Sequence, residues 1–324
     1  MTEIITLSDI SSSNEQKKLL EQNLLKGLRN RSQKRIDSSF FYDTKGSILF
    51  DKITKLKEYY PTRSELEILG SKKKEIKLSL PKNTSIIEFG SGSSIKIQKL
   101  VEALNNPLQY LPIDISKEFL IDNATKFAKK NPEIKVTAIC ADFRQTSKLD
   151  KIMNKNQKRV GFFPGSTIGN FSPIKAKNIL KNIKSTLGKN NHLIIGVDIL
   201  KNKKILENAY NDSKGVTAEF NINILKHLNM RFNSNFNLKK FKHRAFFNTD
   251  KNRIEMHLVS REQQVVEILK SNIKFSEGET IHTENSYKYS TDQFKLKVER
   301  IGYKVLKVWK DSQDLFSVFC LKVK

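Results

Sequence analysis

From residue 84 to residue 198 the chain alternates short apolar runs with stretches in which apolar residues recur every three or four positions. The short runs predict buried strands and the periodic stretches predict amphipathic helices. The predicted strands are residues 85–89, 110–113, 135–140, 160–163 and 193–198. The intervening helices are predicted to begin near Ser94, Lys117, Thr146 and Pro173, the last with Ser172 as its N-cap and Gly188 as its end. Alternation of this kind is typical of an α/β fold with a parallel, doubly wound sheet.

The pattern changes after residue 198. Residues 204–232 are predicted to be helical, and FFNTDKNRIEMHLVS reads as two strands joined by a polar turn. Residues 292–301 predict a helix that Gly302 ends, followed by adjacent strands at residues 303–309 and 315–323. We expect this last hairpin to return to the first sheet, so that residues 201–287 form an insertion.

The residue pattern of the N-terminal segment differs from both of these regions. Residues 1–12 are predicted to be a polar tail, and Ser13 with Gln16 makes a capping box ahead of a leucine-rich helix. An aromatic segment follows, in which Thr62 and Glu65 form a second capping box. The sequence therefore predicts four segments: residues 1–62 and 201–287 make one domain, and residues 63–200 and 288–324 make the other.

Composition narrows the protein class. A length of 324 residues fits about two domains. No apolar run reaches the roughly 18 residues needed to span a membrane, and the N-terminus lacks a signal-peptide pattern, so we expect a cytoplasmic protein. Cys140 and Cys320 are far apart and are expected to be buried core residues.

The formal charge is +25, with 59 Lys and Arg against 34 Asp and Glu. This excess suggests an RNA-binding protein or an RNA methyltransferase as one alternative. However, only 11 of the basic residues are Arg, and the lysines are scattered without an aromatic-interleaved tract. We therefore expect a solvated lysine surface and no nucleic-acid partner.

A glycine-rich turn follows the first predicted strand. In EFGSGSS, Gly90 and Gly92 follow Glu88, and Ile95 occupies the third glycine position of a dinucleotide site, which disfavours that type of site. Asp114 lies 22 residues beyond Gly92 at the end of the second strand, where a carboxylate can accept both ribose hydroxyls.

Asp142 and Phe143 end the third strand. The carboxylate of Asp142 is suited to hold the polar edge of an adenine, and the ring of Phe143 is suited to pack on its apolar face. The alternative is that Asp114 and Asp142 merely cap the following helices.

Several segments resemble one family, the histidine-specific N-alpha-methyltransferases of the ergothioneine pathway. The segments are FYDTKGSILFDKI, EYYPTRSE, EFGSGSSIK, PIDIS, ADF, FFPGSTIGNFSP, AYNDSKGVTAEFNINIL, RIEMHLVS and GETIHTENSYKYS. The likeness extends from about residue 40 to residue 319. It implies a Rossmann-like class I methyltransferase domain with a closing antiparallel hairpin, plus an α+β substrate-binding domain. It also implies that three methyl groups pass from S-adenosylmethionine to the α-amino group of histidine, giving hercynine, the first step of ergothioneine biosynthesis.

The resemblance also assigns site residues by motif. The implied cofactor contacts are Gly90, Lys96, Asp114, Asp142 and Phe143. The implied substrate contacts are Tyr60, Asn170, Tyr210, Glu284 and Ser286, with Tyr42 and Met256 lining the same pocket. Asn170 and Tyr210 are neutral donors for an amino-acid carboxylate, whereas Glu284 can accept an imidazole N–H and Ser286 can serve the other ring nitrogen.

Tyr60 and Tyr42 can orient the amine and offer a ring face to the methylated ammonium. Tyr42 is the candidate catalytic residue, holding the amine or a relaying water, although no general base follows from the sequence. The five histidines include no close metal-ligand pair, so no metal is expected; His282 alone is predicted near the pocket. The substrate alternative is another amino acid or a tryptophan-derived amine, and we expect a monomer.

Overall fold

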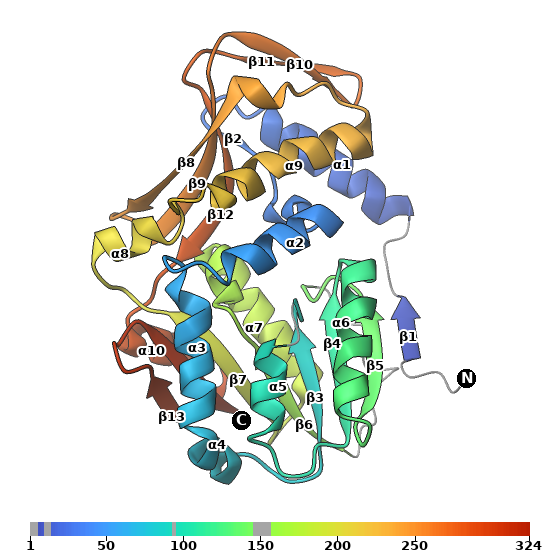
Figure 1. The fold of residues 1–324 in the computed structure, drawn as a ribbon, viewed down its shortest axis with the longest axis vertical. Coiled ribbons are helices and arrows are strands. Elements are labelled where there is room, and N and C mark those ends of the chain that lie inside the picture. Colours follow the sequence, from blue (N-terminus) through green and yellow to red (C-terminus); the bar gives the residue numbers. More distant parts are fainter. Residues whose placement is uncertain (1–5, 10–13, 93–94, 145–156) are drawn as a thin grey trace. The chain divides into compact units, whose positions relative to one another are not determined.

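The computed structural model describes residues 6–9, 14–92, 95–144 and 157–324. The chain forms two compact units. Unit 1 comprises the described residues of segments 1–11, 60–200 and 287–324, and unit 2 those of segments 12–59 and 201–286. The chain therefore passes back and forth between two units, each of which is described by itself below (Figure 1).

Unit 1 is built on an eight-stranded sheet with the order β1-β5-β4-β3-β6-β7-β14-β13. The strands from β1 to β7 in this order pair in parallel, whereas β14 is antiparallel to both β7 and β13. The strands are β1 (Thr6–Asp9), β3 (Thr84–Phe89), β4 (Gln109–Asp114), β5 (Lys135–Cys140), β6 (Lys158–Phe163), β7 (His192–Asp198), β13 (Tyr303–Lys310) and β14 (Phe316–Val323). The predicted doubly wound sheet with a closing hairpin is confirmed.

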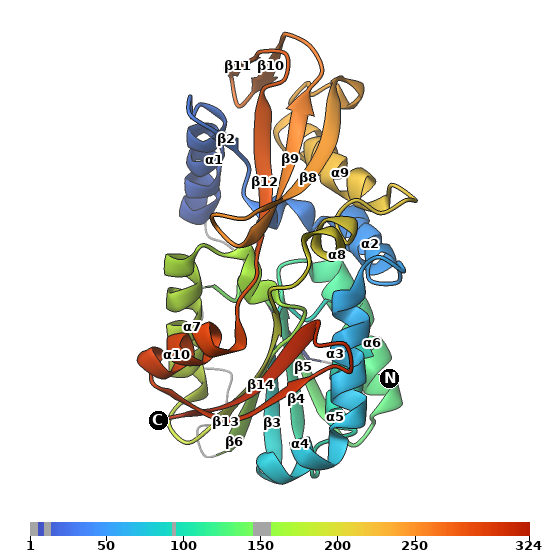
Figure 2. The same ribbon diagram turned by 90° about the vertical axis from the view of Figure 1, so that its left-hand side faces the viewer.

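Helices cover both faces of this sheet, as Figure 2 shows. One apolar core joins the sheet to α7 (Pro173–Leu187) and α10 (Thr291–Ile301). A second core, on the opposite face, joins it to α3 (Tyr60–Ser71), α4 (Lys73–Ser79), α5 (Ile95–Val101) and α6 (Lys117–Lys130). Strands buried on both faces read as nearly continuous apolar runs, which explains why the sequence pattern located them.

The predicted caps of two helices are present. The Ser172 hydroxyl accepts from Lys175 N ahead of Pro173, and Gly188 ends α7 with φ +77°. Gly302 likewise ends α10. Its φ of +101° would strain an L side chain, which explains why this position is a glycine.

Two predictions at the N-terminal side are wrong. Residues 6–9 are not part of a polar tail. They form β1, which pairs in parallel with β5 from Thr6 opposite Thr137 to Asp9 opposite Cys140. These residues thus lie in the sheet of unit 1, although the sequence grouped residues 1–62 in the other domain. The capping box of Thr62 and Glu65 is also wrong, because α3 already begins at Tyr60 and the Glu65 carboxylate bonds elsewhere.

Some predicted features lie outside the described residues. They are the capping-box residue Ser13, Ser94 as a helix start, and the helix start at Thr146.

Unit 2 contains a four-stranded sheet with the order β2-β12-β9-β8 and a separate hairpin of β10 and β11. These strands are β2 (Lys34–Arg35), β8 (Phe241–Asn248), β9 (Arg253–Ser260), β10 (Gln264–Ile268), β11 (Ser271–Phe275) and β12 (Thr280–Tyr287). The predicted hairpin over FFNTDKNRIEMHLVS is β8 and β9, paired from Phe241 opposite Ser260 to Asn248 opposite Arg253.

The helices of unit 2 are α1 (Asn14–Leu28), α2 (Thr44–Ile53), α8 (Lys203–Asn208) and α9 (Val216–Phe232), with short 3-10 turns at η1 (Ser38–Phe41) and η4 (Leu238–Lys240). The single helix predicted over residues 204–232 is therefore two helices. Asp212 explains the new start, because its carboxylate accepts from Val216 N at 2.9 Å and Thr217 N at 2.8 Å. Among the described residues of both units, no helix is long and apolar enough to cross a membrane.

Candidate functional site

The glycine turn after β3 meets the end of β4 within unit 1. Gly90 and Gly92 have φ values of +76° and +47°, a conformation that favours glycine. Gly92 N donates to Asp114 Oδ2 at 3.3 Å, while Ser116 N donates to Asp114 Oδ1 at 2.9 Å. Burial raises the pKa of the Asp114 carboxyl, although backbone N–H groups that donate to it act in the opposite direction.

The N-cap of α6 is Ser116 rather than Asp114. Asp114 therefore links the turn after β3 to the start of α6, and it does not occupy the cap position of the alternative interpretation.

The predicted adenine residues lie beside the same turn. A Cβ atom on Gly90 would approach Phe143 Cε1 to 3.3 Å, so the ring packs directly against the bare backbone of this glycine. The Phe143 ring also meets Phe163 and Phe171 edge-on, with centroids 5.5 and 6.2 Å apart. The Phe143 ring, held edge-on by two other phenylalanines, thus lies against the turn.

Asp142 has a partner that the sequence did not suggest. Arg144 Nε donates to both carboxylate oxygens at 2.9 and 2.8 Å, and Arg144 Nη2 lies 2.7 Å from Oδ2. Both side chains are about one-third exposed or less, at 26% for Asp142 and 32% for Arg144. The guanidinium therefore fixes the orientation of the carboxylate that was predicted to meet the adenine edge.

Lys96 is held by a fully buried carboxylate. Its Nζ atom lies 2.7 Å from Glu65 Oε2, and that same oxygen accepts from Gly165 N at 2.8 Å. Within the described part of the chain, Glu65 Oε1 has no hydrogen-bond partner. The lysine predicted to contact the cofactor is thus oriented by Glu65 of α3, a residue that the sequence assigned to no site.

Glu88 lies beneath the turn rather than in it. It is fully buried, and Tyr110 Oη donates to its Oε2. Burial raises the pKa of the Glu88 carboxyl well above its usual range, despite the hydrogen bond from Tyr110. The pair fixes β3 to β4 just before the glycine turn begins.

Tyr60 and Asn170 are the predicted substrate residues of unit 1. Tyr60 Oη donates to Asp198 Oδ1 and Oδ2 at 2.8 and 2.7 Å, and Lys288 Nζ lies 2.5 Å from Oδ2. Asn170 is half-buried at the end of η3 (Thr167–Asn170), whose N-cap Ser166 is linked to Asp198 N at 2.8 Å.

Tyr42 and Tyr210 lie in an aromatic part of unit 2. Tyr42 follows η1, and its ring meets Phe50 and Phe220 edge-on at 6.1 and 6.2 Å. The Tyr210 ring meets Tyr59 at 6.3 Å, and its carbonyl oxygen is 2.9 Å from His243 Nε2.

Asp43, next to Tyr42, fixes this segment from two sides. Its Oδ1 accepts from Gly46 N at 2.7 Å to cap α2 and from Asn223 Nδ2 of α9 at 2.9 Å.

Glu284, Ser286 and Met256 belong to neighbouring strands of unit 2. Glu284 and Ser286 lie two positions apart on β12, so their side chains leave the same face of the strand. Met256 is buried on β9, and its carbonyl oxygen accepts from Thr283 Oγ1 at 3.1 Å. His282 Nε2 is 3.0 Å from the carbonyl oxygen of Glu284, which holds the backbone at this position.

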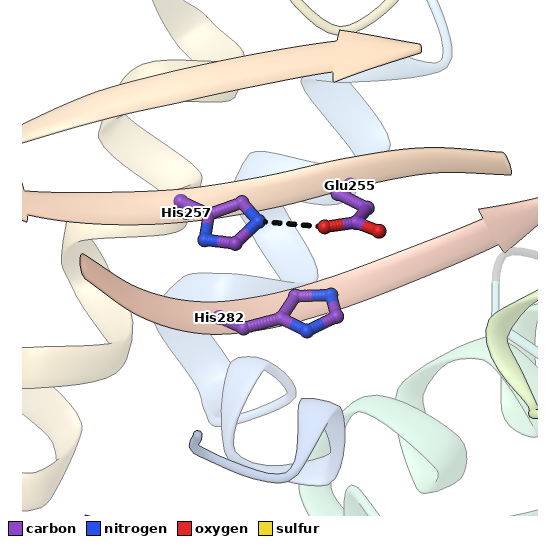
Figure 3. A group of neighbouring side chains, drawn as sticks. All are labelled: Glu255, His257 and His282. Atoms are coloured by element: carbon purple, nitrogen blue, oxygen red, sulfur yellow. Dashed lines mark hydrogen bonds and ion pairs between the residues drawn. The ribbon is translucent and has the colours of Figure 1, made fainter. Parts of the chain in front are cut away.

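Glu255, His257 and His282, which the sequence did not bring together, form a buried cluster (Figure 3). One donor atom from each of these buried residues lies within 4.8 Å of the others. His257 Nε2 is 3.0 Å from Glu255 Oε2, and the two imidazoles stack at 4.7 Å with an interplanar angle of 9°. Burial lowers the pKa of His282 to about 4, and burial lowers that of His257 as well.

The cluster does not have the geometry of a metal centre. A metal ion lies in the plane of each imidazole that binds it, and two stacked, nearly parallel rings do not share such a point. Arg253 also donates to Glu255 Oε1, from Nε at 2.8 Å and from Nη2 at 2.6 Å, placing a cation on the carboxylate. The arrangement is a hydrogen-bonded stack, and the expectation of no metal stays a prediction.

Comparison with known proteins agrees with the sequence motifs. Residues 20–323 match the model of the family described as histidine-specific methyltransferase, SAM-dependent. A histidine N-alpha-methyltransferase from Mycolicibacterium smegmatis is 33% identical over 97% of this chain and 98% of its own length. The enzyme of the same name from Mycobacterium tuberculosis is 33% identical over 92% of this chain and 93% of its own.

Among solved structures, an S-adenosylmethionine-dependent methyltransferase from Clostridium acetobutylicum aligns over 86% of this chain and 98% of its own. The TM-score is 0.46 and the identity 12%. The fold assignment rests on the strand order of unit 1, and the family on the full-length sequence match. The chain belongs to the histidine-specific, S-adenosylmethionine-dependent methyltransferase family.

Proposed function

We propose that this protein is an L-histidine Nα-methyltransferase that converts histidine into hercynine by three transfers from S-adenosylmethionine, the first step of ergothioneine biosynthesis. The observation that carries the proposal is the junction in unit 1 where Gly92 N meets Asp114 and the Phe143 ring packs on Gly90. In this proposal unit 1 is the methyltransferase domain, unit 2 is the substrate-binding domain, and the protein acts in the cytoplasm as a monomer.

The residues around the glycine turn suit an adenosine group. The Asp114 carboxylate is available at a strand end to accept ribose hydroxyls, as in other nucleotide-binding folds. Phe143 offers an apolar face to adenine, while Asp142, oriented by Arg144, offers an acceptor to its amino group. Gly90 allows the backbone to approach a ligand closely, and Lys96 supplies a fixed cation.

The side chains assigned to histidine match its chemistry. Glu284 accepts one imidazole N–H and Ser286 serves the other ring nitrogen from the same face of β12. Asn170 and Tyr210 donate to the carboxylate. Tyr42 orients the amine, with Met256 lining the same pocket.

Transfer itself requires little chemistry from the protein. The amine must be neutral to attack the sulfonium methyl group in line, so one proton leaves before each transfer. Positioning then supplies most of the rate acceleration. Tyr42, held next to the Asp43 cap of α2, is the candidate to hold the amine or a relaying water.

Mass spectrometry of the purified protein incubated with S-adenosylmethionine tests the proposal. With histidine the expected product gains three methyl groups, and with tryptophan the expected product is absent. Methylation of tryptophan in place of histidine would support the alternative substrate class. Metal analysis of the active protein tests the expectation that no metal is needed.

A further inference from the structure

We infer that Asp198, paired with Lys288, is a positioning residue that makes the Tyr60 hydroxyl accept a hydrogen from the substrate amine. The inference rests on the proposed function and deepens it, because it gives Tyr60 a defined hydrogen-bond direction. Neither Asp198 nor Lys288 belongs to the residues that the family motifs assign to the site.

The geometry of the three residues is closely defined. Tyr60 is the first residue of α3, Asp198 is the last residue of β7, and Lys288 directly follows β12. All three are buried, and the side chains of Lys288 and Asp198 are 0% and 1% exposed. Tyr60 Oη lies within 2.8 Å of both oxygens of the Asp198 carboxylate, which fixes the position of the hydroxyl.

The chemistry of the partners sets the direction of each hydrogen bond. A lysine ammonium only donates, and the carboxylate that faces it only accepts. The Tyr60 hydroxyl has a single hydrogen, which it gives to Asp198. Toward any other group Tyr60 is therefore an acceptor, which suits an amine N–H and does not suit a carboxylate.

Asp198 also connects Tyr60 to a second predicted substrate residue. Its backbone N–H donates to Ser166 Oγ at 2.8 Å, and Ser166 begins the 3-10 turn that ends at Asn170. Its carbonyl oxygen accepts from Tyr289 N at 3.3 Å. One buried residue thus sets the hydroxyl of Tyr60 and the start of the Asn170 turn together.

The acceptor direction predicts which transfers depend on Tyr60. The neutral amine of histidine has two N–H groups, the monomethyl amine has one and the dimethyl amine has none. An accepting hydroxyl can orient the nitrogen lone pair in the first two transfers and has no hydrogen to accept in the third.

Single-turnover rates with histidine and with Nα,Nα-dimethylhistidine test this inference. Tyr60→Phe keeps the ring, and we expect it to slow transfer to histidine by roughly tenfold, the usual worth of one hydrogen bond. Transfer to dimethylhistidine is expected to change less than twofold. Asp198→Asn combined with Lys288→Met removes both buried charges together and is expected to show the same substrate dependence, with no further loss when Tyr60→Phe is added.

Asp311→Asn is the matched control, because Asp311 is another buried carboxylate of unit 1 that bonds backbone N–H groups of residues 315 and 316. It is expected to leave the ratio of the two rates unchanged. Binding of S-adenosylhomocysteine verifies that each variant is folded. Equal slowing of both substrates by Tyr60→Phe would overturn the inference, whereas a wild-type protein that methylates neither amino acid would overturn the proposed function instead.

Discussion

The two units hold their buried charged side chains in different ways. In unit 1 the partners are far apart in the sequence, with Lys288 and Asp198 separated by 90 residues. In unit 2, Glu255 is held by Arg253 and His257, each two positions away on the same strand.

The buried pair of Lys288 and Asp198 thus joins separate elements at the end of a strand of unit 1, whereas the buried group around Glu255 orders one face of a strand of unit 2. Substitutions in unit 1 should therefore disturb cofactor binding through several elements, and those in unit 2 should act locally.

The largest expected effect is in unit 1, at Asp114. Asp114→Ala removes a carboxylate predicted to accept two ribose hydroxyls, and each such hydrogen bond contributes roughly 1.5 to 3 kcal/mol. The dissociation constant for S-adenosylhomocysteine should rise at least about a hundredfold by calorimetric titration. Asp122→Ala, an exposed aspartate of α6 paired with Lys126, is the control and should bind normally. Retained affinity in Asp114→Ala would remove Asp114 from the cofactor site.

In unit 2 the corresponding test is Glu284→Ala. We expect histidine to bind about tenfold to a hundredfold more weakly, because an imidazole N–H loses a charged acceptor. The affinity for S-adenosylhomocysteine should stay within about twofold, since unit 2 acts locally. Titration of each ligand measures the two effects, with the exposed Glu277→Ala as control. Equal loss of both affinities would contradict the assigned role.

Acidification should destabilise both units through buried histidines. Burial, followed by the nearby Lys322 and Lys158, lowers the pKa of His192 in unit 1 to about 4, a value similar to that of His282 in unit 2. Since the unfolded histidines titrate near pH 6.5, their stabilising contribution is complete above that pH and is lost as the pH falls toward 4. Protonation of each of these two histidines should lower the free energy of unfolding by about 2 kcal/mol between pH 6.5 and 4.5.

The free energy of unfolding, measured by urea titration across this range, tests the prediction. In His192→Leu, the free energy of unfolding should depend less steeply on pH. The range stops at pH 4.5 because Glu255, whose pKa is lowered to about 2 mainly by His257 and Arg253 against the effect of burial, contributes below it. An unchanged slope in His192→Leu would show that folding does not lower the pKa of this histidine.

The smallest expected effect concerns the net charge of +25. Exposed charges are screened beyond about 8 Å at physiological salt, so kcat/KM for histidine should change less than about twofold between 50 and 300 mM salt. A steep fall would instead indicate that the lysine surface takes part in substrate capture. Gel-shift assays with RNA over the same salt range test the nucleic-acid alternative.

Sequence reasoning located the strand ends of unit 1 because side chains after parallel strands meet at one edge of the sheet. Gly90, Asp114 and Phe143 follow from that rule. Glu65 and Asp198 do not follow from that rule, because their hydrogen-bond partners come from distant segments. For Glu65, the local spacing also suggested a helix cap. β12 was missed because TIHTENSY is polar for a buried strand, and its polar side chains are satisfied by groups such as Asn221 that no periodicity reveals.

The position of β14 has a consequence for how the polypeptide is made. Residues 316–323 lie between β7 and β13 and pair with both, so the sheet of unit 1 is completed only when this late segment is added. During synthesis the edge of β7 stays open while more than a hundred further residues are translated. The sheet therefore closes only once residues 316–323 have been made, and deleting these residues removes an internal strand of the sheet.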